Sequence, residues 1–246
     1  MKLGNPIASG NTAVIYLHEN NIIKVLKDYL PDGESEYEAN KQKYAHSCGL
    51  SVPEIISVTK IGDKQAIIME YVKGKTVGEI AAGENGKAAY YLSLSVDIQL
   101  KIHSKTADSI EPMREKLIRQ IVSTGKLSQI QKKALMKKLE SMAFENRLCH
   151  GDFHLNNLIM SDDNVTIIDW IDSSSGDIRA DVYRTYLLYS QVSSEVAELY
   201  LRLYCQKSGL SKEEILEWAP IIAGARLSEN VSSENNERLI EIVNNG

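Results

Sequence analysis

Most of the strand-forming segments of this sequence lie in its first 72 residues, and this segregation limits the folds that the chain can adopt. A helical stretch at 34–47 interrupts them, and Gly49 and Pro53 are suited to end it. After Gly74 the apolar residues take helical spacing. Strands followed by helices, in place of regular alternation, predict an α+β fold. The apolar or β-branched runs that we expect to form strands are 13–17, 22–26, 55–58 and 66–69.

Helices dominate the remainder of the chain. Apolar residues recur every three to four positions over 87–104 and predict a largely buried helix. Capping boxes at 128–131 and 211–214 each open a further helix, and Gly209 is suited to end the helix before the second box. In the helix after Ser128 we expect Ile130, Leu135, Leu139 and Met142 to face inward, and Lys132, Lys133, Lys137 and Lys138 to face solvent.

Charge and composition exclude several classes of protein. Lys and Arg number 28 against 33 for Asp and Glu, so the net charge is -5 and we expect no nucleic-acid partner. No apolar run approaches the roughly 20 residues that span a bilayer, so we expect a cytoplasmic protein without a membrane partner. The three cysteines, Cys48, Cys149 and Cys205, are too scattered for a disulfide framework, and we expect them to be reduced and buried.

One island of short strands and polar loops interrupts the helical part. It contains the segment His150-Gly-Asp-Phe-His-Leu-Asn-Asn157, and a hairpin later the pair Ile168-Asp169. Asp152, Asn157 and Asp169 would present two carboxylates and an amide oxygen if the fold brought them together. Such oxygen ligands suit Mg²⁺, which binds one or two carboxylates together with water and phosphate. A carboxylate left without metal could then serve as a base.

The pattern H-G-D-x-H-x-x-N followed by I-D resembles the signature of the aminoglycoside phosphotransferase and choline kinase-like family, and the resemblance extends from residue 3 to about 243. It implies a protein-kinase-like two-lobed fold with ATP in the cleft between the lobes. Residues 1–72 would form an N-lobe with a small antiparallel sheet and one helix. Residues 73–246 would form a helical C-lobe with the catalytic loop and the acceptor site.

The resemblance also implies roles for single residues. Asp152 matches the catalytic aspartate that positions the acceptor hydroxyl and accepts its proton. Asn157 and Asp169 match the two Mg²⁺ ligands. His150 and His154 match histidines that support the shape of the loop. Asp181 falls where the next helix opens, and we interpret it as a structural anchor for the catalytic loop.

Lys24 is notable on physical grounds alone, because it interrupts an apolar strand and a buried ammonium requires a counter-charge. The corresponding lysine of the family binds the α- and β-phosphates of the nucleotide and pairs with a glutamate of the following helix. Glu38 fits that role best by its position, and Glu36 and Glu34 remain as alternatives.

Two further segments resemble nucleotide-binding parts of the family. Residues 3–16 resemble the hairpin that covers the phosphates, although of the three glycines of a G-x-G-x-x-G pattern only Gly10 is present. Asn11 and Thr12 could add hydrogen-bond donors there. Residues 69–74 resemble the hinge, where adenine would bond the main chain near Glu70 and Val72.

The acceptor is expected to be a hydroxyl of a small molecule such as an aminoglycoside, an amino alcohol or a sugar. From Asp177 onward eleven acidic and seven basic side chains favour a cationic acceptor. Only eleven residues separate Asp169 from Asp181, which disfavours a protein Ser/Thr kinase. The sequence is also compatible with a nucleotide-binding scaffold without turnover and with a metal-dependent hydrolase. GTP in place of ATP and the oligomeric state stay open.

Overall fold

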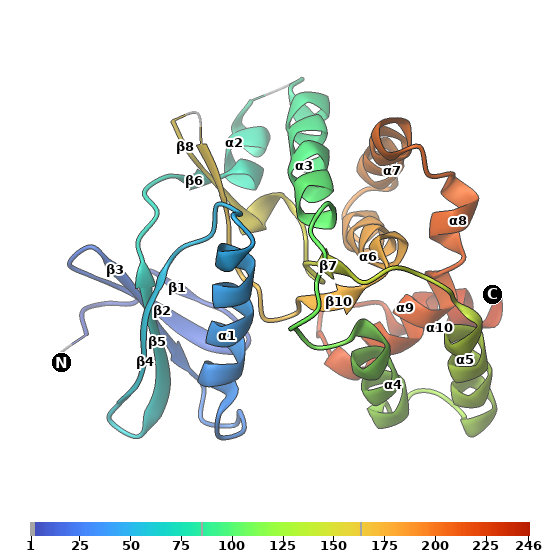
Figure 1. Cartoon of the computed structure of the whole chain (residues 1–246), viewed down its shortest axis with the longest axis horizontal. Coiled ribbons are helices and arrows are strands. Elements are labelled where there is room, and N and C mark those ends of the chain that lie inside the picture. Colours follow the sequence, from blue (N-terminus) through green and yellow to red (C-terminus); the bar gives the residue numbers. More distant parts are fainter. Residues whose placement is uncertain (1–2, 85, 163) are drawn as a thin grey trace. The chain divides into compact units, whose positions relative to one another are not determined.

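The computed structural model describes residues 3–84, 86–162 and 164–246, which form two compact units (Figure 1). The first unit consists of the chain up to Gly83 together with Asn156–Asp172. The second consists of Glu84–Leu155 and Ser173–Gly246. The segment that carries Asn157 and Asp169 therefore belongs to the amino-terminal unit. The lobe boundary after residue 72 stays a prediction.

A five-stranded antiparallel sheet forms the main part of the first unit, in the order β1-β2-β3-β5-β4. Residues Glu19 and Asn20 form the turn between β2 and β3, with Glu19 at a φ of 55°. Lys24 lies in the middle strand β3, paired with Ile15 of β2 and Ile67 of β5. The strands are β1 (Ala8–Ser9), β2 (Ala13–His18), β3 (Asn21–Leu26), β4 (Ile55–Ile61) and β5 (Lys64–Glu70).

Helix α1 (Glu34–Ser47) packs beside β4 and β5, and it has the bounds that the sequence predicts (Figure 1). A second, three-stranded sheet of the same unit joins β6 (Lys75–Thr76), β8 (Leu158–Ser161) and β9 (Asn164–Ile167). The short helix α2 (Val77–Gly83) follows β6. Because β8 and β9 pair as a hairpin, the residue before β8 and the residues after β9 lie at the same end of it.

The second unit is helical apart from the pair β7 (Arg147–Cys149) and β10 (Ser174–Gly176). One large apolar core joins its helices, and it includes the fully buried Trp218 and Tyr200. Its helices are α3 (Ala88–His103), α4 (Met113–Ser123), α5 (Gln129–Ser141), α6 (Ile178–Ser190), α7 (Ser194–Ser208), α8 (Lys212–Leu216), α9 (Ala219–Arg226) and α10 (Asn236–Asn244). Short 3₁₀ turns occupy Leu155–Asn157 and Leu227–Glu229.

Both predicted capping boxes are present, at Ser128 before α5 and at Ser211 before α8, and Gly209 ends α7 in the left-handed conformation. The predicted inner face of α5 is wrong at two positions. Ile130 is 82% exposed, whereas Lys132 is buried. The ammonium of Lys132 donates to the carbonyl of Val122 at 2.7 Å, so a hydrogen bond satisfies its buried charge.

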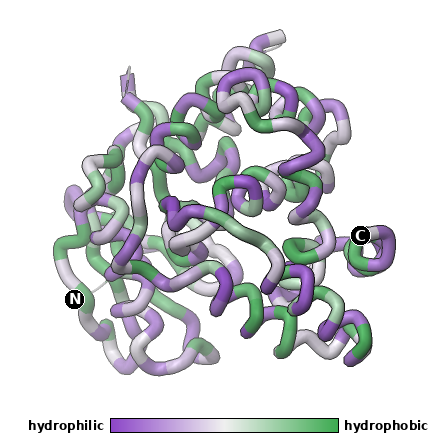
Figure 2. The backbone as a smooth tube through the Cα atoms, turned by 45° about the vertical axis from the view of Figure 1, so that its right-hand side comes forward, coloured by the Kyte–Doolittle hydropathy of each residue, from purple (hydrophilic) through white to green (hydrophobic). Residues whose placement is uncertain are grey.

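The prediction that all three cysteines are buried is also wrong. All three are free thiols, but only Cys149 is fully buried, and Cys48 and Cys205 are partly exposed. Hydrophobic and hydrophilic stretches alternate along the backbone, as expected for elements that bury one side (Figure 2). In the described ranges, no helix combines the length and the apolar character needed to cross a membrane.

Candidate active site

Lys24 lies between two carboxylates of the first unit. Its ammonium is 2.5 Å from Glu38 Oε1 and 3.2 Å from Asp169 Oδ1. Glu38 extends from the buried face of α1, whereas Glu36 is exposed and Glu34 is only half-buried. The glutamate that contacts Lys24 is therefore Glu38.

Burial and neighbouring charges shift the pKa values of Lys24 and Glu38 in opposite directions. Burial alone would lower the pKa of Lys24, but Asp169 and Glu38 together raise it well above its usual value. Burial raises the pKa of Glu38, and the charge of Lys24 opposes that rise. At 2.5 Å from a lysine that stays protonated, we take Glu38 to be ionised at neutral pH. The lysine is thus a fixed cation with two anionic neighbours.

Asn157 and Asp169 lie at the same end of the β8–β9 hairpin. Leu158 pairs with Ile167 at the end of the hairpin, and the amide of Ile168 donates to the carbonyl of Asn157 at 3.0 Å. Asp169 follows directly and turns out of the strand direction with a φ of 64°. This hairpin brings together two residues that are twelve positions apart in the chain.

The chemistry of these two residues fits a hard divalent cation. The side chain of Asp169 is 41% exposed, and Lys24 contacts only its Oδ1. Within the described residues, Asp169 Oδ2 has no hydrogen-bond partner, and Asn157 adds an amide oxygen at the same end of the hairpin. Carboxylate and amide oxygens are ligands that Mg²⁺ accepts.

The predicted phosphate-covering segment forms a hairpin between β1 and β2. Gly10, Asn11 and Thr12 form its exposed turn, and the amide of Gly10 donates to the carbonyl of Ala13 at 2.9 Å. The carbonyl of Thr12 accepts from the amide of Lys27 at 2.8 Å, which ties the turn to the end of β3. The turn is therefore held at both ends, while its side chains stay accessible.

The predicted hinge, residues 69–74, begins with the last two residues of β5. The amide of Glu70 donates to the carbonyl of Glu54 at 2.9 Å. In the described part of the chain, the Val72 amide has no hydrogen-bond partner, so it could bond an adenine. A polar cavity of about 740 Å³ lies beside the hinge, lined by residues such as Val72, Lys73 and Thr166. Glu70 and Val72 line this cavity but Lys24 and Asp169 do not, so the phosphates of a nucleotide are not assigned to it.

Asp152 lies in the second unit, in the loop between β7 and the 3₁₀ turn. His154 Nε2 is 3.5 Å from its Oδ2, and Arg184 Nη2 is 3.6 Å from its Oδ1. Burial alone would raise the pKa of Asp152, but the hydrogen bond with His154 and the charge of Arg184 outweigh it. They hold the pKa of this carboxyl below its usual value, so Asp152 is an anion at neutral pH.

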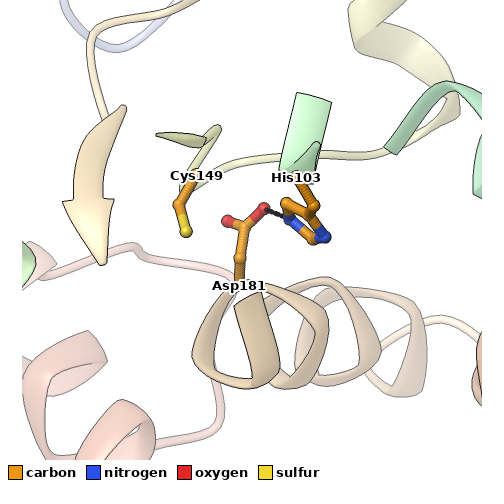
Figure 3. A group of neighbouring side chains, drawn as sticks. All are labelled: His103, Cys149 and Asp181. Atoms are coloured by element: carbon orange, nitrogen blue, oxygen red, sulfur yellow. Dashed lines mark hydrogen bonds and ion pairs between the residues drawn. The ribbon is translucent and has the colours of Figure 1, made fainter. Parts of the chain in front are cut away.

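Asp181 anchors the loop that carries Asp152. Its carboxylate accepts from the amide of Gly151 at 2.7 Å and from that of His150 at 3.2 Å. His103 Nε2 lies 2.8 Å from the same carboxylate (Figure 3). Burial would raise the pKa of Asp181, but the hydrogen bond and the charge of His103 lower it to about 2. Two backbone amides of the loop thus depend on one buried carboxylate.

His103, Cys149 and Asp181 lie close enough together to resemble a metal site (Figure 3). The hydrogen bonds of these side chains argue against a metal site. The second nitrogen of His103 is 2.6 Å from the Tyr204 hydroxyl. The Cys149 thiol donates to the carbonyl of Asp177 at 3.5 Å, so each member of the cluster already has a hydrogen-bond partner in the protein. We interpret the cluster as support for the loop.

Two features near these residues escape sequence reasoning. The first is Arg184, beside Asp152. The sequence gives only a weak indication of it, because an arginine among the apolar residues of α6 would be a buried cation and would require partners. Gly78 lies so close to Asn156 that an added Cβ would be 1.9 Å from its side-chain oxygen. No local pattern marks that close approach, because the two residues are far apart in the chain.

A family model described as the phosphotransferase enzyme family matches residues 4–218. The chain belongs to the phosphotransferase enzyme family. The match confirms the resemblance seen in the catalytic-loop signature.

Solved structures of several phosphotransferases are similar to this one in fold. A thermostable mutant of aminoglycoside phosphotransferase APH(4)-Ia, in complex with AMP-PNP and hygromycin B, has a TM-score of 0.70 at 14% identity, covering 98% of this chain and 93% of that one. Choline kinase LicA from Streptococcus pneumoniae has a TM-score of 0.65 at 16% identity, covering 100% and 94%. These similarities confirm the predicted α+β, protein-kinase-like fold.

A probable serine/threonine-protein kinase from Clostridium perfringens is 32% identical over 81 residues. The similarity covers 32% of this phosphotransferase and only 12% of that protein. This chain therefore matches a small part of the curated relative.

Proposed function

We propose that the protein transfers the γ-phosphoryl group of ATP to a hydroxyl of a small molecule. The observation that carries the proposal is Lys24, a buried cation held by Glu38 and Asp169. Two of its three N–H groups face these carboxylates, and the third can donate to a phosphate oxygen. ATP is supplied in the cytoplasm, so the proposal places the enzyme there.

The nucleotide would be bound by residues of the first unit. Gly10, Asn11 and Thr12 form the accessible turn that would cover the phosphates, and the main chain near Glu70 and Val72 would bond adenine. Asn157 and Asp169 would hold Mg²⁺, which when bound neutralises charge on the phosphates. An AMP-PNP and Ca²⁺ complex of amicoumacin kinase, at a TM-score of 0.63, supports a nucleotide and a divalent cation.

Asp152 would orient the acceptor hydroxyl and take its proton. A lowered pKa keeps this carboxyl ionised, so it can accept a hydrogen bond at any pH near neutral. Asp152 and Asn157 are only five positions apart in the chain. Catalysis would then rest mainly on positioning and electrostatic stabilisation, as is general for phosphoryl transfer.

The named ligands of similar proteins support a small-molecule acceptor, because an aminoglycoside phosphotransferase, a choline kinase and amicoumacin kinase all share the fold. A protein acceptor is the second candidate, supported by the partial similarity to a probable serine/threonine-protein kinase. Between Asp169 and Asp181 the chain forms only β10 and the first turn of α6, which leaves little room for a folded activation segment.

A coupled ADP-release screen of the purified protein tests the proposal. The panel contains aminoglycosides, choline, ethanolamine, homoserine, methylthioribose and other sugars, with ATP or GTP and with or without Mg²⁺. A generic protein substrate forms a separate arm. We expect a magnesium-dependent hit among the small molecules. Nucleotide binding without transfer to any acceptor or to water would contradict the proposal and favour a non-catalytic scaffold.

The Asp152→Ala variant tests the assigned base. Loss of a general base should lower kcat by about 10²- to 10⁴-fold with little change in nucleotide affinity. Asp97→Ala is the matched control, because Asp97 is exposed and forms a surface ion pair with Lys207. Normal turnover by Asp152→Ala would refute the role given to Asp152.

A further inference from the structure

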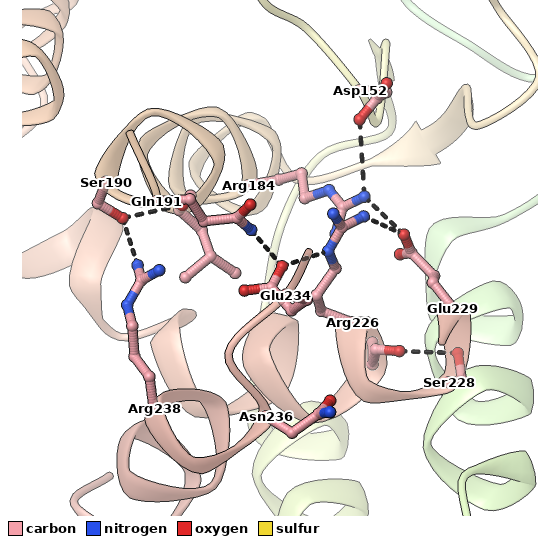
Figure 4. A network of polar contacts seen from close by, with 12 residues as sticks. Asp152, Arg184, Ser190, Gln191, Arg226, Ser228, Glu229, Glu234, Asn236 and Arg238 are labelled. Carbon is pink, nitrogen blue, oxygen red and sulfur yellow. Dashed lines mark hydrogen bonds and ion pairs between the residues drawn. The ribbon is translucent and has the colours of Figure 1, made fainter. Parts of the chain in front are cut away.

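Four charged side chains link Asp152 to the last helices of the second unit (Figure 4). Arg184 Nη2 is 3.6 Å from Asp152 Oδ1 but only 2.9 Å from Glu229 Oε2. Glu229 also accepts from Arg226, whose Nε donates to Glu234 at 2.9 Å. The arginine beside Asp152 therefore binds a second carboxylate more closely than it binds Asp152.

This network is largely shielded from solvent. The side chains of Arg184 and Arg226 are 8% exposed, and that of Glu234 is 2% exposed. Arg184 Nε also donates to the carbonyl of Gly151 at 3.2 Å, next to Asp152 in the chain. Buried charges that share hydrogen bonds have few alternative positions, because each move leaves a partner unsatisfied. The position of the Arg184 guanidinium is thus set by the residues around it.

We propose that Arg184 positions the carboxylate of Asp152, and that Glu229 sets the distance at which it does so. Arg184 orients the carboxylate through a long contact of 3.6 Å. A direct bidentate pair with Arg184 would occupy the oxygens that must accept the substrate hydroxyl. Glu229 prevents that pair by holding the guanidinium at 2.9 Å. The segment from Leu227 to Glu234 thereby acts on the catalytic loop from the distant end of the chain.

The inference rests on the proposed function for its effect on turnover, but the positioning itself can be measured without turnover. Among the described residues, Arg184 and His154 face the Asp152 carboxylate, and His150 Nδ1 accepts from the Asp152 amide at 3.3 Å. The two histidines stay in place in every variant below, so a change in the behaviour of Asp152 reports on the arginine and on Glu229.

The test compares Arg184→Met, Glu229→Gln and the double variant in the full chain, with ATP, Mg²⁺ and water as the acceptor. Loss of orientation should lower the basal kcat by about 10- to 100-fold in Arg184→Met, with the KM for ATP little changed. Glu229→Gln should lower kcat by roughly 10-fold. Because Glu229 acts through Arg184, the double variant should be no slower than Arg184→Met. Effects that multiply in the double variant would overturn the proposal.

Carbon-13 NMR of carboxyl-labelled aspartate, with the Asp152 signal assigned from Asp152→Asn, gives a second measurement that needs no activity. Arg184→Met should raise the titration midpoint of Asp152 by about one pH unit or more, as expected when a cation within 4–6 Å is lost. Glu229→Gln should leave the midpoint unchanged or lower it, because the freed guanidinium approaches Asp152. An unchanged midpoint in Arg184→Met, or a rise in Glu229→Gln, would refute the positioning role.

Arg238→Lys is the matched control, because Arg238 lies in the same region but bonds Ser190 (Figure 4). It should keep basal kcat within about two-fold of wild type. A wild-type protein that neither hydrolyses ATP nor phosphorylates any acceptor would refute the proposed function, while the NMR titration would still decide the positioning role.

Discussion

Replacing Asp181 with alanine should destabilise the helical unit severely, because four donors converge on this one buried carboxylate. They are the amides of His150 and Gly151, at 3.2 and 2.7 Å, and the side chains of Gln99 and His103, at 3.3 and 2.8 Å. Asp181 is 2% exposed, so water cannot replace the lost acceptor without entering the core.

The expected loss follows from this arrangement. Each buried donor left without an acceptor costs about 1–3 kcal/mol, and removal of one partner of a buried ion pair costs about 3–5 kcal/mol. The surroundings relax in part and the terms overlap, so we expect a decrease of about 3–5 kcal/mol in the free energy of unfolding at pH 7. That is a large share of the stability of an ordinary domain.

The loss of unfolding free energy in Asp181→Ala should also depend on pH. The folded pKa of Asp181 is about 2, below the usual 3.8, so the ionised group contributes stability above about pH 4. As the pH falls from 4 to 2 the carboxylate takes up a proton and this contribution, about 2 kcal/mol, disappears. The difference between wild type and Asp181→Ala should therefore shrink over that interval and stay constant above it.

Urea titrations followed by tryptophan fluorescence measure these differences. A Trp170→Phe background leaves Trp218, which lies in the same unit as Asp181 and donates to Asp177. Asp97→Ala is the control, since its pair with Lys207 is exposed and worth no more than about 1 kcal/mol. If Asp181→Ala unfolded within 1 kcal/mol of wild type at pH 7, the anchoring role of Asp181 would be wrong.

Three shorter predictions concern other parts of the chain. Lys24→Met should weaken ATP binding and lower turnover by at least about 10-fold, measured as KM and kcat, and unchanged constants would contradict its role. Leu135→Ala should cost about 2–5 kcal/mol in urea titrations, whereas Ile130→Ser, at an exposed site of the same helix, should stay within about 0.5 kcal/mol. Ser128→Ala removes the cap of α5 and should lower the free energy of unfolding by about 0.5–2 kcal/mol in the same titrations. A loss of that size in Ile130→Ser would refute the assignment of Ile130 to the exposed face of α5.

The sequence alone determined the fold class and most of the elements. Helix α1, both capping boxes and the strands around Lys24 follow local rules, because periodicity and end signals act over a few residues. The catalytic-loop signature indicated the family for the same reason. Its residues are close together in the chain, so their spacing is visible without coordinates.

Tertiary structure decided which side chains become partners. The sequence showed that Lys24 needs a carboxylate, but only the packing of α1 on the sheet places Glu38, and not Glu34 or Glu36, within reach. The inner face of α5 was mispredicted because the carbonyl of Val122, on another helix, accepts a hydrogen bond from Lys132.

Two charged partners of Arg184, Asp152 and Glu229, lie 32 and 45 positions away in the chain. A local pattern shows that a buried charge must be satisfied, since desolvation acts on each residue by itself. The residue that satisfies it is chosen by the packing of distant segments, and only the folded chain brings those segments together.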